Sequence, residues 1–308
     1  MIEKDLYLNR MPLVSICIPT YNQVGHFQNA LNSVLAQKFQ DYEIIVTDDS
    51  DNDDIANYIN QIPSRDRIRY IRNQPSLGSP ANWNKALSFA SGKFIKILHH
   101  DDQFFDESSL GRFVEAFSSN PDANCIFCAL LRCDARTGSE ETHQPNSRDL
   151  FMLRKNPSIL FCGNFVGPPS GIIFRAPLKH LFNEKLKWLV DIDFYINNWT
   201  GKEFLFLPEA LVKVTSGDPD QATSSFEFDV KINLFEYFTL FDRLHNGIAK
   251  NELRKYIRKL RRILANLNVT NIEEIRRAGF GEDIPKSISQ FLPIIRFNQT
   301  LAKCLARI

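Results

Sequence analysis

The sequence lacks several features that define large classes of proteins. No run of 18 apolar residues occurs among the 308, and the first stretch, MIEKDLYLNR, has no apolar block like that of a signal peptide. We therefore expect no membrane span and a cytoplasmic location. The six cysteines fit a reducing compartment. Cys125 and Cys128 spell C-x-x-C within a predicted strand, where residues three apart face opposite ways, so we expect no zinc site there.

Net charge is also small, at +1, and no nucleic-acid recognition motif occurs, which argues against a nucleic-acid partner. The charge is unevenly distributed. Residues 250–308 contain 13 Lys and Arg against 5 Asp and Glu, so this end carries +8 and the rest of the chain −7. Two interpretations of the basic end stay open. It is either a solvated helix face or a surface that contacts anionic lipid at the inner face of the cell membrane.

What the sequence does contain is an alternation of strand and helix patterns. Apolar, β-branched runs at 13–18, 42–46, 68–71 and 94–98 predict strands, and the segments between them have apolar residues at helical spacing. This order predicts an α/β protein with a mostly parallel, Rossmann-related central sheet flanked by helices. Ligands bind beyond the carboxyl ends of the strands in such sheets.

Polar side chains follow three of these runs, as PTYN, TDDS and HHDD. Because the runs end at one edge of the sheet, the carboxylates gather there and repel one another. A divalent cation relieves this repulsion, and oxygen ligands suit Mg²⁺ or Mn²⁺. The alternative is that Asp101 and Asp102 only cap the next helix. His99 and His100 point to opposite sides of a strand, so at most one of them reaches the ion.

The second half of the chain predicts further elements. A helix is expected at 110–117, a strand at 124–131, a short strand in NFVGPPSGIIF and a helix in WLVDIDFYINNW. The polar segment 136–149 is predicted to be a mobile loop. From Phe226 onward the pattern is helical, with one amphipathic stripe that runs from Leu253 to Leu267.

Three motifs together resemble the nucleotide-binding half of family 2 glycosyltransferases with the GT-A fold. They are PLVSICIPTYN, YEIIVTDDSDND and GKFIKILHHDD, in that order and spacing, and the resemblance extends roughly from Pro12 to Leu240. It implies a nucleotide-sugar-binding half at 1–105, an acceptor-binding half at 106–225 and a helical C-terminal extension at 226–308.

The resemblance also implies roles for single residues. Asp101 matches the family's metal-binding aspartate, and Asp102 the acidic residue that often follows. His99 stands where the family has its first aspartate, and Trp83 where an arginine is frequent. Pro19 to Tyr21 would line the nucleoside pocket, and Asp48 or Asp49 would accept a hydrogen bond from the base. The residues assigned to the nucleotide are Pro19, Thr20, Tyr21, Asp48, Asp49, Asn84, His100 and Lys213, the last as a cation near the diphosphate.

The segment Val190-Asp191-Ile192-Asp193 resembles the family's Glu-Asp-x-x motif without its glutamate, so Asp191 matches the general base. A carboxylate beside the apolar Trp188 would have a raised pKa, which suits proton removal from an acceptor hydroxyl. Asp191 could instead be an N-cap or a surface residue of the helix. Asp193 lies deeper in the helix and is the weaker candidate. Trp188 and Trp199 could stack on a sugar or belong to the core.

These expectations combine into one function. The resemblance implies an inverting, metal-dependent glycosyltransferase that moves a sugar from a nucleoside-diphosphate donor to a glycan or lipid-linked glycan, as in bacterial surface polysaccharide or O-antigen synthesis. Two alternatives remain. One is a nucleotide-sugar-binding protein without catalysis, and the other is a sugar nucleotidyltransferase, for which PTYNQVGHF is a poor phosphate-binding loop.

Overall fold

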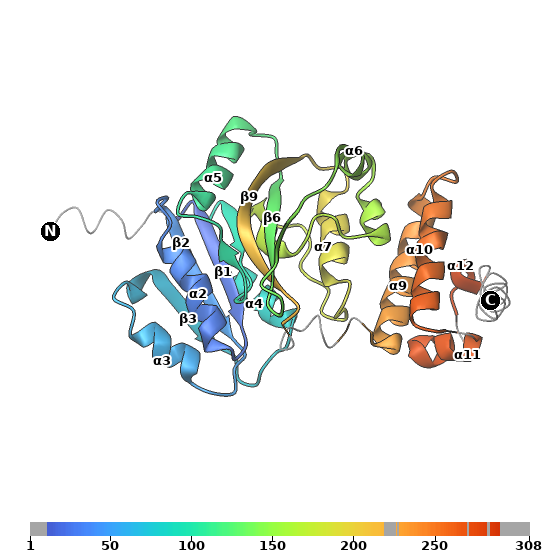
Figure 1. The fold of residues 1–308 in the computed structure, drawn as a ribbon, viewed down its shortest axis with the longest axis horizontal. Helices are drawn as coiled ribbons and strands as arrows, with labels where there is room; N and C mark the ends of the chain where they lie inside the picture. The colour runs from blue at the N-terminus through green and yellow to red at the C-terminus, as the bar shows by residue number, and fades with distance from the viewer. Residues whose placement is uncertain (1–10, 219–225, 227, 270, 282–283, 290–308) are drawn as a thin grey trace.

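A computed structural model describes residues 11–218, 226, 228–269, 271–281 and 284–289 (Figure 1). Its centre is a nine-stranded sheet of order β3-β2-β1-β4-β8-β6-β9-β5, with β7 beside β6. The strands are β1 (Val14–Thr20), β2 (Tyr42–Asp48), β3 (Ile68–Arg72), β4 (Phe94–Ile97), β5 (Gln103–Phe104), β6 (Cys125–Asp134), β7 (Glu140–His143), β8 (Ile172–Arg175) and β9 (Phe204–Ser216).

Helices cover both faces of this sheet, as the alternating sequence pattern predicts. The described α-helices are α2 (Val24–Leu35), α3 (Asp54–Asn60), α4 (Ala81–Ser88), α5 (Ser109–Ser119), α6 (Ser147–Lys155), α7 (Val190–Trp199), α9 (Val230–Leu244), α10 (Leu253–Asn266), α11 (Ile272–Ile275) and α12 (Lys286–Ser289), of which α9 to α12 lie away from the sheet. None of the described helices is long and apolar enough to cross a membrane.

The sheet changes character halfway across. The neighbours β3, β2, β1 and β4 are all parallel. Beyond β4, strand β8 is antiparallel to both β4 and β6, whereas β9 runs parallel to β6. The α/β class is confirmed, but the sheet is parallel in its first half and mixed in its second. The connections in the mixed half still contain helices, with α5 between β5 and β6, α6 between β7 and β8, and α7 between β8 and β9.

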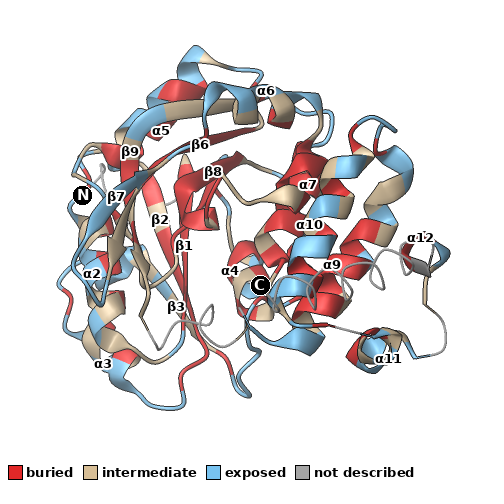
Figure 2. Cartoon of the chain, turned by 45° about the vertical axis from the view of Figure 1, so that its right-hand side comes forward, coloured by how far each residue is buried: buried red, intermediate tan, exposed pale blue. Residues whose placement is uncertain are grey.

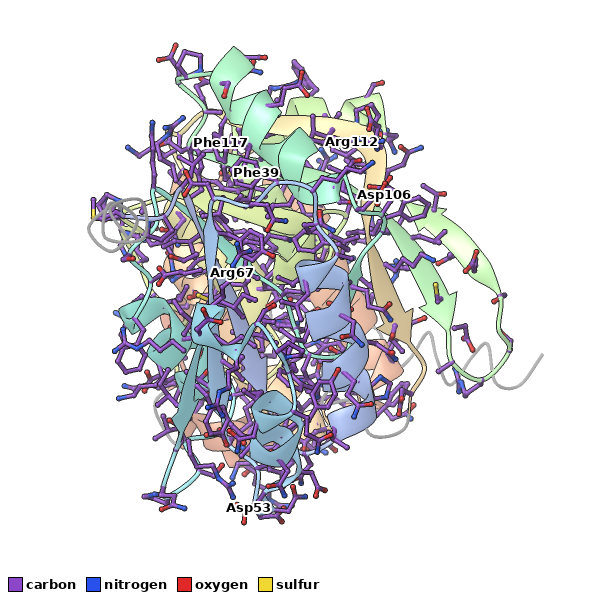
Figure 3. All side chains as sticks on the ribbon, turned by 90° about the vertical axis from the view of Figure 1, so that its left-hand side faces the viewer. Phe39, Asp53, Arg67, Asp106, Arg112 and Phe117 are labelled. Carbon is purple, nitrogen blue, oxygen red and sulfur yellow. The ribbon has the colours of Figure 1, made fainter. Side chains whose placement is uncertain are left out.

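Alternation along β1 explains why both faces are covered. Ile16 and Ile18 point into one apolar cluster, together with α2, α3 and α5, whereas Cys17 points into the other. Figure 3 shows the first of these faces, with Asp106 and Arg112 near one end of α5 and Asp53 at the opposite end of the face. Likewise, Cys125 and Cys128 are buried in different clusters, as predicted for residues three apart in a strand.

The C-terminal helices extend the second cluster. Helices α7, α9 and α10 lie side by side in both views (Figures 1 and 2). The apolar stripe of α10 packs inward through Tyr256, Leu260 and Leu264, so this stripe is covered by protein. The prediction of an amphipathic helix is therefore confirmed over residues 253–266. Residues 290–308, which hold part of the predicted extension, lie outside the described residues.

One expectation about secondary structure is wrong. The segment 136–149 was expected to be a loop, but it contains strand β7, which pairs with β6 from Leu130 to Cys133. It also contains the start of α6, where Asn146 and Asp149 form a reciprocal capping box. Polar composition hid both elements, because an exposed edge strand needs no apolar side chains when its stability comes from backbone pairing.

Candidate active site

Two buried aspartates, Asp48 and Asp49, lie at the carboxyl end of β2, beside the end of β1. The Asp48 carboxylate accepts hydrogen bonds from the Ser50 backbone N–H at 2.8 Å and from the Tyr70 hydroxyl at 2.7 Å. Burial, together with the nearby Asp48 charge, raises the pKa of Tyr70 to about 12. The Asp49 carboxylate accepts hydrogen bonds from Asn73 and from the Gly78 backbone, both at 2.7 Å. Asp48 therefore has a fixed orientation, and Asp49 closes the loop before α4.

An asparagine that the sequence prediction missed joins these strand ends. Asn82 is buried, and its amide donates to the carbonyls of Thr20 at 3.1 Å and Thr47 at 3.2 Å. Asn84, the predicted residue, points elsewhere. Its amide donates to the Phe182 carbonyl at 2.9 Å and accepts from the Phe182 backbone N–H at 2.9 Å. Asn84 thus joins α4 to the acceptor-side segment, and any role at the nucleotide is indirect.

An acidic cluster follows β4. One ligand atom each from His99, Asp101 and Asp102 lies within 4.8 Å of the other two. The Asp102 carboxylate is buried and accepts the Thr215 backbone N–H at 3.3 Å, and the Thr215 hydroxyl donates to the Asp101 carbonyl at 2.8 Å. Burial and the neighbouring Asp101 charge raise the pKa of Asp102 well above its usual value. The end of β9 therefore braces the cluster.

His99 completes the cluster. Its Nε2 atom is buried without a hydrogen-bond partner among the described residues, and its ring lies against Trp83 with centroids 4.6 Å apart. Burial lowers the pKa of His99 to about 4, so the imidazole is neutral near pH 7 and can donate a lone pair to a metal. His100 turns away and contacts Gln23 at 3.0 Å and the Pro19 backbone. The structure thus brings His99, and not His100, to the predicted metal ligands.

A buried lysine lies beneath the cluster. Lys96 of β4 has no exposed surface, and its ammonium donates to the backbone carbonyls of Ser170 and Ile172. Burial lowers the pKa of Lys96 to about 8. The Ser170 hydroxyl accepts the His99 backbone N–H at 2.9 Å and also hydrogen-bonds Asp102. Neither Lys96 nor Ser170 was predicted, because a single charge in an apolar run gives no sign of its partner.

Asp191 occupies the first turn of α7, as predicted. Burial alone raises its pKa to about 7, and among the described residues its carboxylate has no hydrogen-bond or ion-pair partner. It does not cap its own helix. Asp193 is different, since its carboxylate lies 2.6 Å from the Arg243 guanidinium. Asp191 is therefore available to a ligand, whereas Asp193 is already paired.

Hydrogen bonds connect α7, the helix that carries Asp191, to the acidic cluster through one loop. Tyr195, one turn further along α7, donates its hydroxyl proton to the Gly167 carbonyl at 3.0 Å. Three residues later the same loop provides Ser170, which contacts both His99 and Asp102. The helix that carries Asp191 and the metal-ligand candidates are therefore fixed to the same short segment.

Aromatic rings form a second connection. Trp83, which packs on His99, meets Phe182 edge-on with centroids 5.1 Å apart, and Phe182 stacks on Phe194 of α7 at 3.9 Å. Such aromatic contacts add to the stability that comes from burying apolar area, and they favour one relative placement of the elements. Both connections therefore link the acidic cluster to α7, the helix that carries Asp191.

The other predicted residues lie near this site with differing exposure. Thr20 is buried at the end of β1, whereas Tyr21 beside it is 53% exposed. The Lys213 ammonium lies 5.3 Å from the centroid of the Phe105 ring, and no described contact joins it to the cluster. Trp199 is buried and stacked on Tyr195, so it belongs to the core.

Solved structures with the same arrangement are glycosyltransferases. Residues 1–349 of TarS from S. aureus, in complex with UDP-GlcNAc, give a TM-score of 0.58 with 16% identity over 92% of this chain and 88% of that one. The mannosyltransferase PcManGT from Pyrobaculum calidifontis, in complex with GDP-Man and Mn²⁺, gives 0.56 with 13% identity over 97% and 82%. The fold is therefore that of the GT-A glycosyltransferases.

Sequence comparison identifies the family within this class. The model described as glycosyl transferase family 2 matches residues 15–182, and the chain belongs to this family. A Campylobacter jejuni protein named GalNAc(5)-diNAcBac-PP-undecaprenol beta-1,3-glucosyltransferase is 38% identical over 63% of this chain and 62% of its own. An uncharacterised Mycobacterium tuberculosis protein is 30% identical over 65% and 66%. The chain thus matches about two thirds of the length of these relatives.

Proposed function

We propose that this protein is an inverting, metal-dependent glycosyltransferase that uses a nucleoside-diphosphate sugar. The observation that supports this most strongly is that two different acidic groups are linked through the same loop. One is a cluster of two carboxyls and a neutral imidazole, and the other is the isolated Asp191, whose pKa is about 7. The first suits a cation, and the second suits reversible proton transfer near neutral pH.

The residues after β4 fit a divalent metal. Asp101 and Asp102 would hold Mn²⁺ or Mg²⁺ through oxygen, and His99 would add a nitrogen ligand through its buried Nε2 atom. When bound, the ion supplies positive charge opposite the diphosphate that departs from the sugar. Thr215 and Ser170 orient the protein ligands before the ion arrives.

The donor nucleotide is assigned to the ends of β1 and β2. Tyr21 presents an exposed ring for the nucleoside beside Pro19 and Thr20, and the base lies near Asp48 and Asp49. His100 borders this region through the Pro19 backbone. Lys213 serves as a point cation for the diphosphate after its side chain leaves Phe105.

Asp191 acts as the general base. Its unpaired carboxylate accepts the proton of the acceptor hydroxyl while that oxygen attacks the anomeric carbon. The bond from the sugar to the diphosphate breaks in the same step, and the nucleoside diphosphate leaves with the bonding electron pair. One displacement from the face opposite the leaving group inverts the anomeric centre.

The acceptor is a glycan or a lipid-linked glycan of a surface polysaccharide such as an O-antigen. Support comes from the Campylobacter relative, whose name includes an undecaprenol-linked glycan. The chain would act in the cytoplasm, at the inner face of the membrane. Arg254, Arg258 and Arg261 lie exposed along one side of α10, so contact with anionic lipid would be electrostatic, because the apolar stripe is buried. Failure of anionic vesicles to retain the protein at low salt would remove this part of the proposal.

Assays with a panel of UDP- and GDP-sugars and Mn²⁺ test the whole proposal. We expect sugar transfer or donor turnover by the wild-type protein, and we expect this activity to be lost in Asp101→Ala and Asp191→Ala. Full activity in both variants, or activity undiminished after exhaustive chelation, contradicts the mechanism. Tight nucleoside-diphosphate binding without turnover of any donor would favour a binding protein, and pyrophosphate release from a nucleoside triphosphate would favour a nucleotidyltransferase.

A further inference from the structure

The C-terminal helix α9 contains a buried carboxylate that the proposed mechanism does not use. Glu236 is 2% exposed, and it accepts three consecutive backbone N–H groups. The donors are Lys187 at 2.6 Å, Trp188 at 2.9 Å and Leu189 at 2.7 Å. Burial raises the pKa of Glu236, whereas these three hydrogen bonds favour its charged form. Burial of a carboxylate costs free energy. The three hydrogen bonds offset part of this cost and fix the backbone of residues 187–189.

That segment leads directly into the helix of Asp191. Leu189 is the N-cap of α7, and a leucine side chain cannot accept hydrogen bonds from the backbone of the helix start. Glu236, from another helix, instead accepts the N–H groups of the three residues that lead into α7, and its negative charge lies at the positive end of the α7 dipole. Glu236 therefore holds the entry to α7, and Asp191 lies two residues beyond Leu189.

Two other residues of α9 contact the same segment. Arg243 is seven positions after Glu236, which places both on one face of α9, and its guanidinium lies 2.6 Å from Asp193. Tyr237 forms a side-chain hydrogen bond with Trp188. Helix α9 thus holds the chain on both sides of Asp191, whose carboxylate has no partner in the part of the chain that the structure describes. Figures 1 and 2 show α9 beside α7.

We propose that Glu236 is a positioning residue for Asp191, and that the helical extension thereby sets the geometry of the general base. This inference rests on the proposed role of Asp191. In the described residues, the loops after β1, β2 and β4 are held by other partners, including Asn82, Ser170 and Thr215. Loss of Glu236 should therefore slow the chemical step and spare nucleotide binding.

The test compares two variants that each remove one buried carboxylate from the extension. Glu236→Gln keeps the shape but offers only one acceptor oxygen, and it turns an NH₂ group toward N–H donors. The matched control is Glu252→Gln. Glu252 is also buried, but it pairs with Lys155 of α6 at 3.2 Å and has no described contact with residues 187–193.

Five quantities are measured for each variant: kcat, the pH profile of kcat, the KM for the donor, the affinity for UDP or GDP, and Tm. We expect kcat of Glu236→Gln to fall about 100-fold, because a displacement of about 1 Å has that effect on a positioned group. Donor KM and nucleotide affinity should stay within about twofold, and the acidic limb of the kcat profile should move below pH 7 as water reaches Asp191. Glu252→Gln should lose comparable Tm and keep both kcat and the pH profile.

Each outcome decides the inference. A folded Glu236→Gln variant with wild-type kcat and pH profile overturns it, and so does a loss of kcat in both variants in proportion to their Tm. If Glu236→Gln does not fold, Arg243→Gln removes the second contact and is read by the same criteria. Absence of transfer in the wild-type protein with every donor would instead refute the proposed function, so the two failures are distinguishable.

Discussion

Burial raises the pKa of both Asp102 and Asp191, and Asp102 alone of the two also lies beside a like charge. For Asp102 the causes are burial and the adjacent charge of Asp101. For Asp191 burial is the only cause. Repulsion between like charges is relieved by a cation, whereas desolvation of a single carboxylate is relieved by a proton. The comparison supports the proposal of metal binding at the first position and proton transfer at the second.

The two carboxyls also differ in how they are held. Asp102 is fixed within the sheet by its hydrogen bonds to Thr215 and Ser170. Asp191 lies on a helix whose preceding residues are held by Glu236 from the C-terminal extension. The proposed metal position is therefore part of the central fold, and the proposed base is held by a helix outside the residues that match the family model.

The largest expected effects are a loss of kcat from one carboxyl position and a loss of Mn²⁺ affinity from the other. Asp191→Asn should reduce kcat by about 10²- to 10⁴-fold, as expected for loss of a general base, and leave Mn²⁺ affinity unchanged. Asp101→Asn should weaken Mn²⁺ binding, measured by calorimetry. Asp53→Asn, which changes an exposed carboxylate, is the control for both (Figure 3). Loss of Mn²⁺ binding in Asp191→Asn would mean that the two sites do not have separate functions.

A second prediction concerns pH. Because burial raises the pKa of Asp191 to about 7, the fraction of the carboxylate form falls as pH decreases below 7. The kcat should then fall about tenfold per pH unit between pH 6 and 5, measured at saturating metal and donor. A profile that is flat down to pH 5 would show that the base has an ordinary carboxyl pKa.

The metal preference should depend on His99. An imidazole ligand favours Mn²⁺ over Mg²⁺, which prefers oxygen. His99→Asp should therefore lower the ratio of Mn²⁺ to Mg²⁺ affinity by about tenfold, measured by competition titration of the bound Mn²⁺ signal. His100→Gln is the matched control and should leave this ratio unchanged, because His100 turns toward Gln23. An equal ratio in wild type and His99→Asp would exclude His99 as a ligand.

The smallest effect is on stability. The folded-state pKa of Asp191 lies above the ordinary value of 3.8, so ionisation destabilises the fold progressively from pH 4 to pH 7, and the full penalty is present above pH 7. Asp191→Asn removes this penalty. Its Tm should exceed that of wild type by a few degrees at pH 8 and by almost nothing at pH 4, measured by calorimetry. Equal Tm differences at both pH values would contradict the burial of this carboxyl.

Much of the fold was predictable from local patterns. The apolar runs that became β1 to β4 and the helical spacing of α2, α4 and α5 follow directly from burial on two faces of a sheet. Strand β7 was not predictable, because it lies at an edge and its residues are polar. Local pattern identifies elements that bury apolar side chains, and it misses those that are stabilised by backbone pairing alone.

The site was predictable only where a side chain follows a strand or starts a helix. Asp101 and Asp191 were found in this way. Ser170 and Glu236 were not, because each acts on residues that are distant in the sequence, Ser170 on His99 and Glu236 on Leu189. Strand alternation predicts that at most one of His99 and His100 reaches the cluster, and the structure agrees, but alternation alone cannot tell which of the two it is.

The most direct test of this account is the titration of the Asp191 carboxyl itself. The protein is labelled with ¹³C at aspartate carboxyl carbons, and the resonance that is absent in Asp191→Asn is followed from pH 4 to 9, with and without Mg²⁺. We predict a midpoint near pH 7 that Mg²⁺ leaves unchanged. A midpoint near 4, or one that moves strongly when Mg²⁺ binds, would contradict the assignment of the proton to Asp191 and the cation to the cluster.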